Sequence, residues 1–410
     1  MKTVYINYTD SITVPSQKKW SKYLKSGNKT EYHGGGNYSN MLLQKLQKHH
    51  DGYEFVLLWP KDRPPQTEFE KTLFHGGDYT IQQIKSLSDD IDFIEGSTLF
   101  LPVLHNPADY KTVKRIKSAN PSLKIVATIH DLRSNFNNYG GVTRYYFTGI
   151  KYHLFFLQKP MFWFLNKFYF NRLIKKGMSA LDRIFTDSNY SLQQIIKYPI
   201  KGSITTHFLS LPPGNTKICP APSHDPADNF FLFVSGGRPV KNFLRTLEAF
   251  CIFKEIDENN YFLYVTGVDG KMLDNMMRYK GIKKKTVSDY VRPMGYVDEA
   301  ALDSLYGSCN MLLYTSLYEG FGLPLLEAAR RGRPAISSYA SSIPEVLGSC
   351  TYYTDPYNVK SIAEAMAYMA QEDVLKQYED RVSRCFPVLE QRGQDETETV
   401  IEYILEKEWI

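Results

Sequence analysis

Short apolar runs bounded by turn residues recur along the first half of the chain. They are VYINY near the start, EFVLLW at 54–59, STLFLPVL at 97–104 and LKIVATIH at 123–130. Unbroken runs of this length are typical of parallel strands that are buried on both faces. Residues 37–48 follow the first run and carry apolar side chains at helical spacing. This alternation of strands and helices predicts a doubly wound α/β domain.

The segment DRIFTDSNYSLQQIIKY at 182–198 closes this half of the chain. Ile184 and Phe185 end a predicted strand, and the Ser and Asn residues after them are suited to capping the helix that follows. The sequence LPPGN at 211–215 then breaks the pattern, because its prolines cannot continue a regular element. We therefore place the end of the first domain at residue 215.

A second α/β pattern begins at residue 230, after a Pro-rich polar stretch. Its predicted strands are FFLFV, YFLYVTG, MLLYTS and PAISS, and its predicted helices are LRTLEAFCIF, DEAALDSLYGSC and PLLEAARR. The last apolar pattern, ETETVIEYILEKEW, predicts a final helix that crosses back to the first domain. The sequence thus predicts a first domain at 1–215, a linker at 216–229, a second domain at 230–390 and a crossover helix at 391–410.

The composition narrows the classes of protein that fit. The 49 basic and 44 acidic residues give a net charge of +5, well short of the electrostatic footprint of a nucleic-acid binder, so we expect no nucleic-acid partner. The five cysteines are widely spaced and form no Cys-x-x-Cys pair, which favours free thiols in a reducing compartment. The N-terminal sequence MKTVYINYTD lacks the apolar core of a signal peptide. We therefore expect a cytoplasmic protein.

Residues 145–176 combine aromatic and basic side chains more densely than the rest of the chain. Pro160 and the recurring basic residues leave uncharged runs well short of the roughly 20 residues that a spanning helix needs. A basic aromatic segment can instead lie on an anionic membrane surface, which would make the protein peripheral at the inner face of the membrane. Alternatively, these aromatic side chains fill the interdomain side of the first domain.

The stretch YEGFGLPLLEA at 318–328 lies between a predicted strand and a predicted helix. Gly320 and Gly322 allow backbone amides to approach a ligand closely, and the N-terminus of the following helix favours an anion. Glu319 lies on the loop and Glu327 about one turn into the helix, so both carboxylates can face one ligand at different points along its length. The alternative is a tight turn in which Glu319 is a solvated cap and Glu327 only complements the helix dipole.

This stretch resembles the glutamate-pair signature of glycosyltransferase family 4, the retaining group 1 glycosyltransferases. Other parts of the chain resemble the family in the same order, namely HGGGNYSNML, TIHDL, TDSNYSLQQI, SGGRPVKNFLRTLEAF, MGYVDEAALDSLYGSCNMLLYTS and RGRPAISSYASSIPEVLG. The resemblance covers most of the chain. It implies an α/β GT-B fold, in which two Rossmann-like doubly wound domains face each other across a cleft and a C-terminal helix crosses back.

The resemblance also implies roles for residues of the second domain. Arg238 and Lys241 would bind the donor diphosphate, Glu319 would contact the transferred sugar, and Glu327 would bind the ribose hydroxyls. The remaining donor-binding positions are Gly236 and Gly237 as a phosphate cradle, Tyr296 and Val297 at the nucleotide base, and Gly320, Phe321, Gly322 and Leu323 around the sugar and diphosphate. Taken alone, Arg238 and Lys241 are also consistent with a solvated surface pair.

In the first domain, the resemblance places His130 beside the donor sugar and the acceptor, and Gly34, Gly35 and Gly36 on a glycine-rich loop that faces the cleft. His130 ends an apolar run at the carboxyl edge of the predicted sheet, where ligands of open α/β folds bind. A single His at a strand end is otherwise commonly a hydrogen-bonded structural residue. The sequence shows no metal-ligand motif, and we expect neither a metal nor another cofactor.

Together these features predict a metal-independent, retaining glycosyltransferase. It would move a hexose from a nucleoside-diphosphate sugar to a glycan or lipid-linked glycan acceptor in bacterial surface polysaccharide synthesis. The alternatives are an isomerase or phosphorylase with the same fold and a non-catalytic nucleotide-sugar-binding subunit, because a fold does not by itself determine a function.

Overall fold

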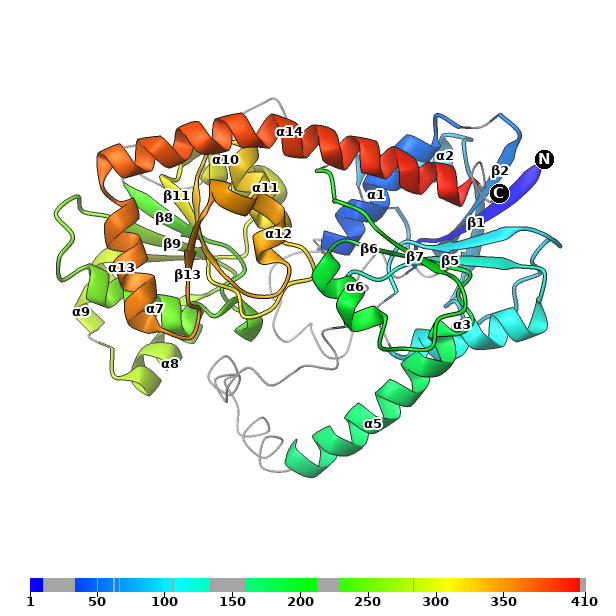
Figure 1. The fold of residues 1–410 in the computed structure, drawn as a ribbon, viewed down its shortest axis with the longest axis horizontal. Helices are drawn as coiled ribbons and strands as arrows, with labels where there is room; N and C mark the ends of the chain where they lie inside the picture. The colour runs from blue at the N-terminus through cyan, green and yellow to red at the C-terminus, as the bar shows by residue number, and fades with distance from the viewer. Residues whose placement is uncertain are drawn as a thin grey trace. The chain divides into compact units, whose positions relative to one another are not determined.

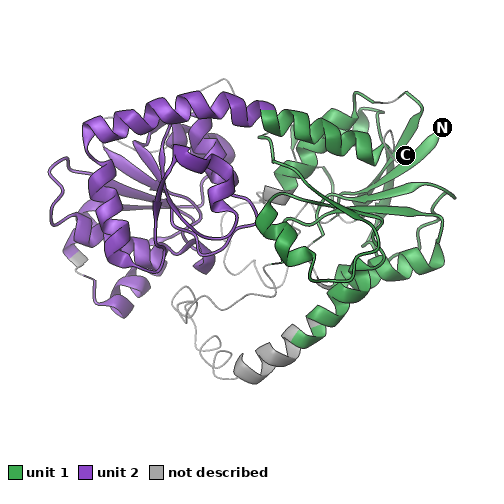
Figure 2. Ribbon diagram, viewed as in Figure 1, with its two compact units in different colours: residues 1–135, 166–212, 392–410 green, residues 136–165, 213–391 purple. Residues whose placement is uncertain are grey.

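The computed structural model describes residues 1–9, 34–49, 51–61, 63–65, 67–104, 107–132, 159–211, 229–282 and 284–405. The chain forms two compact units (Figure 2). Unit 1 comprises residues 1–135, 166–212 and 392–410, and unit 2 comprises residues 136–165 and 213–391. The predicted linker falls almost entirely outside the described residues. Because each unit contains its own sheet and core, we describe each separately.

Unit 1 is built around a seven-stranded parallel sheet in the order β3-β2-β1-β4-β5-β6-β7 (Figure 1). Its strands are β1 (Lys2–Asn7), β2 (Tyr53–Pro60), β3 (Thr80–Ile84), β4 (Thr98–Leu101), β5 (Lys124–Thr128), β6 (Arg183–Thr186) and β7 (Ser203–Thr206). Its helices are α1 (Gly34–Leu46), α2 (Glu68–His75), α3 (Pro107–Ala119), α5 (Lys159–Met178, which begins in residues assigned to unit 2) and α6 (Asn189–Ile195). The four apolar runs predicted to be strands form β1, β2, β4 and β5.

Unit 2 contains a six-stranded parallel sheet in the order β10-β9-β8-β11-β12-β13. Its strands are β8 (Phe230–Phe233), β9 (Phe262–Thr266), β10 (Val291–Gly295), β11 (Met311–Tyr314), β12 (Ala335–Ser338) and β13 (Tyr352–Thr354). Its helices are α7 (Phe243–Phe253), α8 (Gly270–Lys280), α9 (Lys284–Tyr290), α10 (Glu299–Ser308), α11 (Leu323–Arg330), α12 (Ile343–Leu347), α13 (Val359–Met369) and α14 (Glu372–Ile404), with the short 3₁₀ turns η3 (Pro239–Lys241) and η4 (Gly348–Cys350). This is the strand order of the Rossmann fold.

Burial explains which strands the sequence revealed. All four residues of β8, β11 and β12 are buried, since helices cover both faces of the sheet, and these strands read as unbroken apolar runs. The edge strands β3 and β7 have the sequences TIQQI and SITT, and most of their residues are partly or fully exposed. Neither strand forms a continuous apolar run, so the hydrophobic pattern does not predict them.

The C-terminal helix is much longer than predicted. The pattern starting at residue 396 is only the end of α14, a 33-residue helix that begins at Glu372 and contains Pro387. Its residues up to 391 belong to unit 2, whereas the rest belong to unit 1 (Figure 2). Ile401 and Ile404 are fully buried. The prediction that a C-terminal helix crosses back to the first domain is therefore confirmed, but its starting point was wrong because the first half of the helix is mainly polar.

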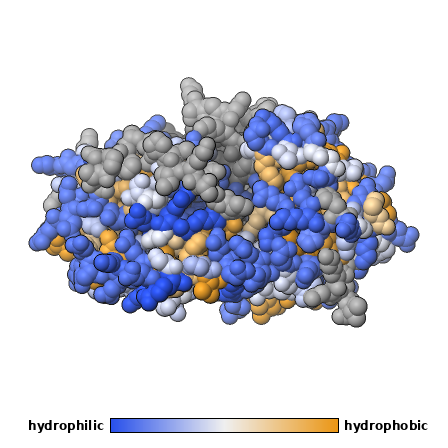
Figure 3. Space-filling view, turned by 90° about the horizontal axis from the view of Figure 1, so that it is seen from above, coloured by the Kyte–Doolittle hydropathy of each residue, from blue (hydrophilic) through white to orange (hydrophobic). Residues whose placement is uncertain are grey.

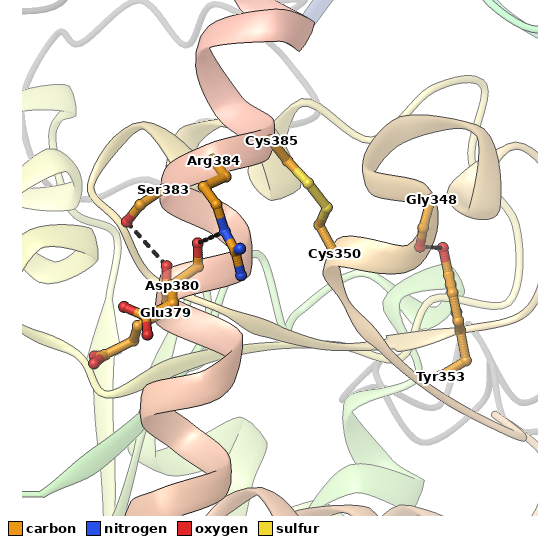
Figure 4. Close-up of a disulfide and its surroundings, with 8 residues drawn as sticks. All are labelled: Gly348, Cys350, Tyr353, Glu379, Asp380, Ser383, Arg384 and Cys385. Atoms are coloured by element: carbon orange, nitrogen blue, oxygen red, sulfur yellow. Dashed lines mark hydrogen bonds between the residues drawn. A yellow bond between two sulfur atoms is a disulfide. The ribbon is translucent and has the colours of Figure 1, made fainter.

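Two cysteines differ from the expectation of free thiols. Cys350 and Cys385 form a disulfide that joins η4 to the middle of α14 within unit 2 (Figure 4). They are 35 residues apart, and the fold brings their Cα atoms to 6.7 Å from each other. A spacing of this size carries no recognisable disulfide pattern, so the sequence could not indicate the pair.

No helix of the described part of the chain is long and apolar enough to cross a membrane. The surface seen from the side on which α14 lies in Figure 1 is largely hydrophilic, with scattered apolar residues (Figure 3). On α5, however, Phe168, Tyr169, Arg172, Lys175 and Lys176 are exposed, whereas Ile174 and Met178 are buried. Two large aromatic residues and three basic residues therefore share one exposed helical face.

Candidate functional site

The turn before α11 is organised by its own backbone and by two serines. Gly322 precedes the helix with φ 138° and ψ 46°, a conformation that residues with a Cβ rarely adopt, and Pro324 lies in the first turn as predicted. The backbone N–H of Glu319 donates to Ser341 Oγ at 2.8 Å. Ser342 Oγ donates to the carbonyl oxygens of Glu319 at 3.0 Å and Phe321 at 2.9 Å. The loop after β12 therefore holds the glutamate-bearing turn in place.

Lys241 and Glu319 form a buried ion pair. Lys241 Nζ lies 2.8 Å from Glu319 Oε1, and each residue is only 6% exposed. The ammonium also donates to Tyr314 Oη at 3.2 Å and lies 4.7 Å from the centre of that ring. The interpretation of Glu319 as a solvated cap and of Lys241 as a surface residue is therefore wrong. A buried pair at the carboxyl end of a parallel sheet is suited to exchanging partners with a charged ligand.

Glu327 is the second carboxylate of this site. It lies on the second turn of α11, where the hydroxyl of the buried Tyr306 on α10 donates to Glu327 Oε2 at 2.7 Å. Burial raises the pKa of Glu327, and the hydrogen bond from Tyr306 and the positive charge of Lys241 oppose this rise. The positive charge of Arg330 opposes the rise as well.

Gly236 and Gly237 are required by packing between loops. A Cβ on Gly237 would lie 2.2 Å from the carbonyl oxygen of Gly267, and one on Gly236 would lie 2.6 Å from Val265 Cγ2. The loop after β8 therefore touches the backbone of the loop after β9, and only glycine fits there. This observation explains the two glycines without a ligand, and their role as a phosphate cradle stays a prediction.

The other predicted donor residues lie on loops around the same sheet. Arg238 is exposed and directly precedes η3, which ends at Lys241. Tyr296 and Val297 follow β10, the strand at the edge of the sheet, and Tyr296 is exposed. Gly320 and Leu323 belong to the turn that contains Glu319. The structure thus brings Lys241, Glu319 and Glu327 together, whereas Tyr296 and Val297 lie on the outer strand's loop.

In unit 1, three polar residues follow neighbouring strands. The register pairs Thr128 of β5 with Phe185 of β6, and Thr186 of β6 with Thr206 of β7. His130 and Asp187 therefore follow β5 and β6 at equivalent positions, and His207 lies beside Asp187 at the end of β7. His130 Nδ1 lies 2.9 Å from Asp187 Oδ2. The prediction from the family resemblance did not include Asp187 or His207.

Tyr38 of α1 lies against His130 and His207. Its ring meets His130 edge-to-face at 5.0 Å between centroids and lies 5.4 Å from the ring of His207. Its hydroxyl is 3.1 Å from Thr128 Oγ1. Burial, with the nearby His130, lowers the pKa of His207 to about 3, so His207 is neutral at physiological pH. Burial likewise raises the pKa of Asp187, a shift that its hydrogen bond to His130 opposes.

The predicted glycine-rich loop is not a loop where the structure describes it. Gly34, Gly35 and Gly36 form the first turn of α1, ahead of the buried Tyr38. Glycine is a poor helix former, but the N–H groups of a first turn have no partner within the helix and remain available to a ligand. A role in close ligand approach stays a prediction, although its location is a helix N-terminus.

Sequence reasoning missed the residues that support the site, namely Tyr38, Asp187, His207, Tyr306, Tyr314, Ser341 and Ser342. All of them except His207 fall inside the segments that carry the family resemblance. Their roles depend on contacts between distant parts of the chain. Within the described ranges, no cluster of three His, Cys, Asp or Glu side chains could hold a metal ion.

Comparison with known proteins relates part of the chain to a family. Residues 216–384 match the family model described as glycosyl transferases group 1. The second unit is therefore similar to the group 1 glycosyltransferases. The O-antigen chain mannosyltransferase B of Escherichia coli is 27% identical over 214 residues, which are 50% of this chain and 56% of that protein. The chain therefore spans just over half the length of this relative.

Solved structures resemble the chain over nearly its whole length. The sucrose-phosphate synthase of Thermosynechococcus elongatus matches with a TM-score of 0.61 at 14% identity, covering 98% of this chain and all of that one. Anabaena HepE in complex with UDP and glucose matches with a TM-score of 0.60 at 11% identity, covering 99% of both chains. With its two parallel-sheet units, the protein has the GT-B fold, as the sequence predicted.

The contact between Tyr306 and Glu327 leads to a testable prediction. In a Tyr306→Phe variant, the pKa of Glu327 should rise further, because burial then acts without the hydroxyl that stabilises the carboxylate. Binding that needs the ionised carboxylate is lost as the pH falls through this pKa, so the loss should begin at a higher pH than in the wild type. We expect affinity for a nucleotide-sugar donor at neutral pH to fall about three- to tenfold.

Calorimetric titration of the donor across a pH series measures this shift. Tyr352→Phe is the control, since Tyr352 lies in β13 of the same unit and its ring packs against Tyr368 and Tyr378. A Tyr306→Phe variant that matches the wild type at every pH would show that the hydroxyl has no influence on the donor site.

Proposed function

We propose that this protein is a group 1 glycosyltransferase that transfers a hexose from a nucleoside-diphosphate sugar, with retention of anomeric configuration and without a metal ion. The observation that carries the proposal is the buried pair of Lys241 and Glu319 beside the start of α11, with Glu327 in electrostatic contact with the same lysine. This arrangement offers a cation to a diphosphate and two carboxylates to sugar hydroxyls within one unit.

The chemistry follows from where charge develops. As the glycosidic bond of the donor breaks, negative charge grows on the departing diphosphate, and Lys241 and Arg238 would stabilise it. Glu319, released from its ion pair, would accept hydrogen bonds from the transferred hexose, and Glu327 from the ribose. The two basic residues supply the charge stabilisation that a metal ion provides in other transferases, so we expect a chelator to leave the rate unchanged.

For the acceptor we propose a growing bacterial surface polysaccharide. The support is the similarity to the O-antigen chain mannosyltransferase of Escherichia coli, which covers half of this chain. Mannose is accordingly the hexose to test first, and a glycan or lipid-linked glycan the acceptor class. The acceptor would bind unit 1 near His130.

A lipid-linked acceptor would bring the enzyme to a membrane surface. The exposed face of α5 supports peripheral binding, since Phe168 is 70% and Tyr169 56% exposed and Arg172, Lys175 and Lys176 extend the same face. Aromatic rings can enter the interface while basic groups meet anionic headgroups. The earlier part of the aromatic segment, residues 145–158, lies outside the described residues.

Replacing Phe168 and Tyr169 together with Ser should weaken binding to vesicles of phosphatidylglycerol and phosphatidylcholine about tenfold, because two interfacial anchors are lost. Co-sedimentation measures the effect, and added salt should weaken binding of the wild type. Ile196→Ser with Ile256→Ser is a matched control, since both residues are exposed and apolar but lie outside α5. If the intact protein does not bind anionic vesicles, the membrane proposal is wrong.

The donor assignment is tested with a panel of UDP-, GDP-, ADP- and dTDP-sugars, GDP-mannose among them. A transferase should be thermally stabilised by one donor and should slowly release the nucleoside diphosphate, with both effects lost in Glu327→Ala and Arg238→Ala variants. Rearrangement of the sugar without release would indicate an isomerase, and release of a sugar phosphate in the presence of phosphate a phosphorylase. Binding without any reaction, even with a glycan acceptor, would indicate a non-catalytic subunit.

A further inference from the structure

The carboxyl edge of the unit 1 sheet contains buried polar atoms without hydrogen-bond partners in the described structure. They are His130 Nε2, Asp187 Oδ1, Thr186 Oγ1 and both ring nitrogens of His207. Asp187, Thr186 and His207 are each at most 3% exposed. Buried polar atoms are normally paired, so such a cluster indicates a place prepared for a polar ligand. Its members follow three adjacent strands, β5, β6 and β7.

The imidazole ring of His130, which carries the unpaired Nε2, is held in its orientation by several neighbours. Asp187 Oδ2 pairs with Nδ1 of His130, and Ser191 Oγ donates to the His130 backbone carbonyl at 2.8 Å. The Tyr38 ring meets the imidazole at an interplanar angle of 89°. The remaining nitrogen, Nε2, therefore has a fixed direction. The hydrogen bond that Asp187 accepts also decides which ring nitrogen carries the proton, because an ionised carboxylate can only accept.

We propose that Asp187 is a positioning residue that keeps the proton of neutral His130 on Nδ1, so that Nε2 accepts a hydrogen bond from a hydroxyl group of a bound sugar. The proposal rests on the proposed function and adds to it the tautomer and the residue that sets it. Asp187 itself touches no substrate. A sugar hydroxyl fits the cluster because it can donate to Nε2 while it accepts from another group.

The number of protons that His130 and Asp187 share decides whether Nε2 can accept a hydrogen bond. With the carboxylate ionised and the imidazole neutral, the shared proton lies on Nδ1 and Nε2 is bare. Adding one proton places a hydrogen on Nε2, whether the pair becomes imidazolium and carboxylate or neutral imidazole and carboxylic acid. The groups that face His130 are Asp187 after β6, Tyr38 on α1, His207 after β7 and the neighbouring Asp131. Since His207 is neutral at physiological pH and Tyr38 is not ionised there, the pair of His130 and Asp187 governs this step.

The experiment is nitrogen NMR on protein with ¹⁵N-labelled histidine, in which long-range ¹⁵N–¹H correlations show which ring nitrogen carries the proton. A His130→Gln variant assigns the signals. At pH 8 the wild type should show the proton on Nδ1. In Asp187→Asn, where the amide can donate to Nδ1, the proton should move to Nε2, and Asp187→Glu should restore the wild-type pattern. A wild-type spectrum with the proton on Nε2 at pH 8, or an Asp187→Asn spectrum identical to the wild type, overturns the proposal.

Kinetics supply a second readout. With the active donor, kcat/KM of Asp187→Asn should fall roughly 10- to 100-fold, the loss expected when a buried acceptor becomes a second donor. Burial raises the pKa of Asp187, so the wild-type rate should decline as the pH falls and this carboxylate takes up a proton, and the decline should be absent from Asp187→Asn. Asp182→Asn is the control, because Asp182 accepts from Lys117 and the backbone of Ile125 in the same unit. It should keep the wild-type tautomer and pH profile even if it lowers stability. A control that changes the tautomer equally would overturn the proposal.

The two proposals fail separately. The NMR signature needs no substrate, so it holds or falls regardless of the donor panel. Absence of any nucleotide-sugar reaction would remove the proposed function while leaving the tautomer result intact.

Discussion

A Lys241→Met variant is expected to lose about 3–5 kcal/mol of the unfolding free energy of unit 2 and all measurable donor binding. The reason is that the Glu319 carboxyl group would lose its ammonium partner in a site where the residue is 6% exposed. Tyr314 would lose its hydrogen bond and its cation contact in the same step. The unfolding free energy is measured by urea denaturation, monitored with a spectroscopic signal that reports on unit 2. Calorimetry measures donor binding.

The double variant Lys241→Met with Glu319→Gln separates structure from function. It contains neither charge, so most of the stability should return, because neutral groups cost little to bury compared with an isolated carboxylate. Donor binding should stay absent, since both of the groups that we propose to bind the donor are missing. If the single variant is as stable as the wild type, the ion pair contributes nothing to the fold. If the double variant binds the donor normally, these residues are not part of the donor site.

A Gly237→Ala variant should be destabilised by about 3 kcal/mol and should bind the donor at least tenfold more weakly. Its new methyl group would start 2.2 Å from the carbonyl oxygen of Gly267, and that atom belongs to the backbone rather than to a flexible side chain. The loops after β8 and β9 would have to separate, which moves Arg238 and Lys241 together. Thermal unfolding and donor titration report the two effects.

Gly270→Ala is the matched control for this variant. Gly270 lies at the start of α8 in the same unit, and nothing lies within 4 Å of the Cβ that it would gain. Alanine is a better helix former than glycine, so we expect unchanged or slightly higher stability and normal donor binding. A Gly237→Ala protein as stable as Gly270→Ala would mean that the two loops separate at no cost.

The parts of this fold that the sequence predicted are those whose residue types do not depend on which particular residues pack against them. Strands such as β8 and β11 are predictable because a strand covered on both faces must be apolar, whichever helices cover it. The N-cap of α6 is equally local, and Ser188 accepts the hydrogen bond from Ser191 as the capping pattern predicted. Edge strands and the polar first half of α14 lack such a requirement, and the pattern missed them.

The residues of the candidate site also divide into those that the sequence shows and those that only the fold brings together. The turn from Glu319 to Glu327 is a contiguous string, so its residue types are visible in the sequence. The partner of Glu319 lies 78 positions earlier, and the partner of His130 lies 57 positions later. Those pairs exist because β8 adjoins β11 and β5 adjoins β6. Asp187 was visible within a helix-capping motif, and only the strand register turns its side chain toward His130.

The shared helix α14 has a consequence for the order in which the protein is made. Val400, Ile401, Ile404 and Leu405 are at most 1% exposed and belong to unit 1, and Gly393 lies too close to Ser210 for any larger residue. These residues leave the ribosome after the whole of unit 2. Unit 1 therefore cannot complete its core until unit 2 has been synthesised, even though its first strand is made first. Cleavage of the chain between residues 212 and 213 would leave unit 1 without the residues that complete its core. The other fragment would retain every strand of the unit 2 sheet.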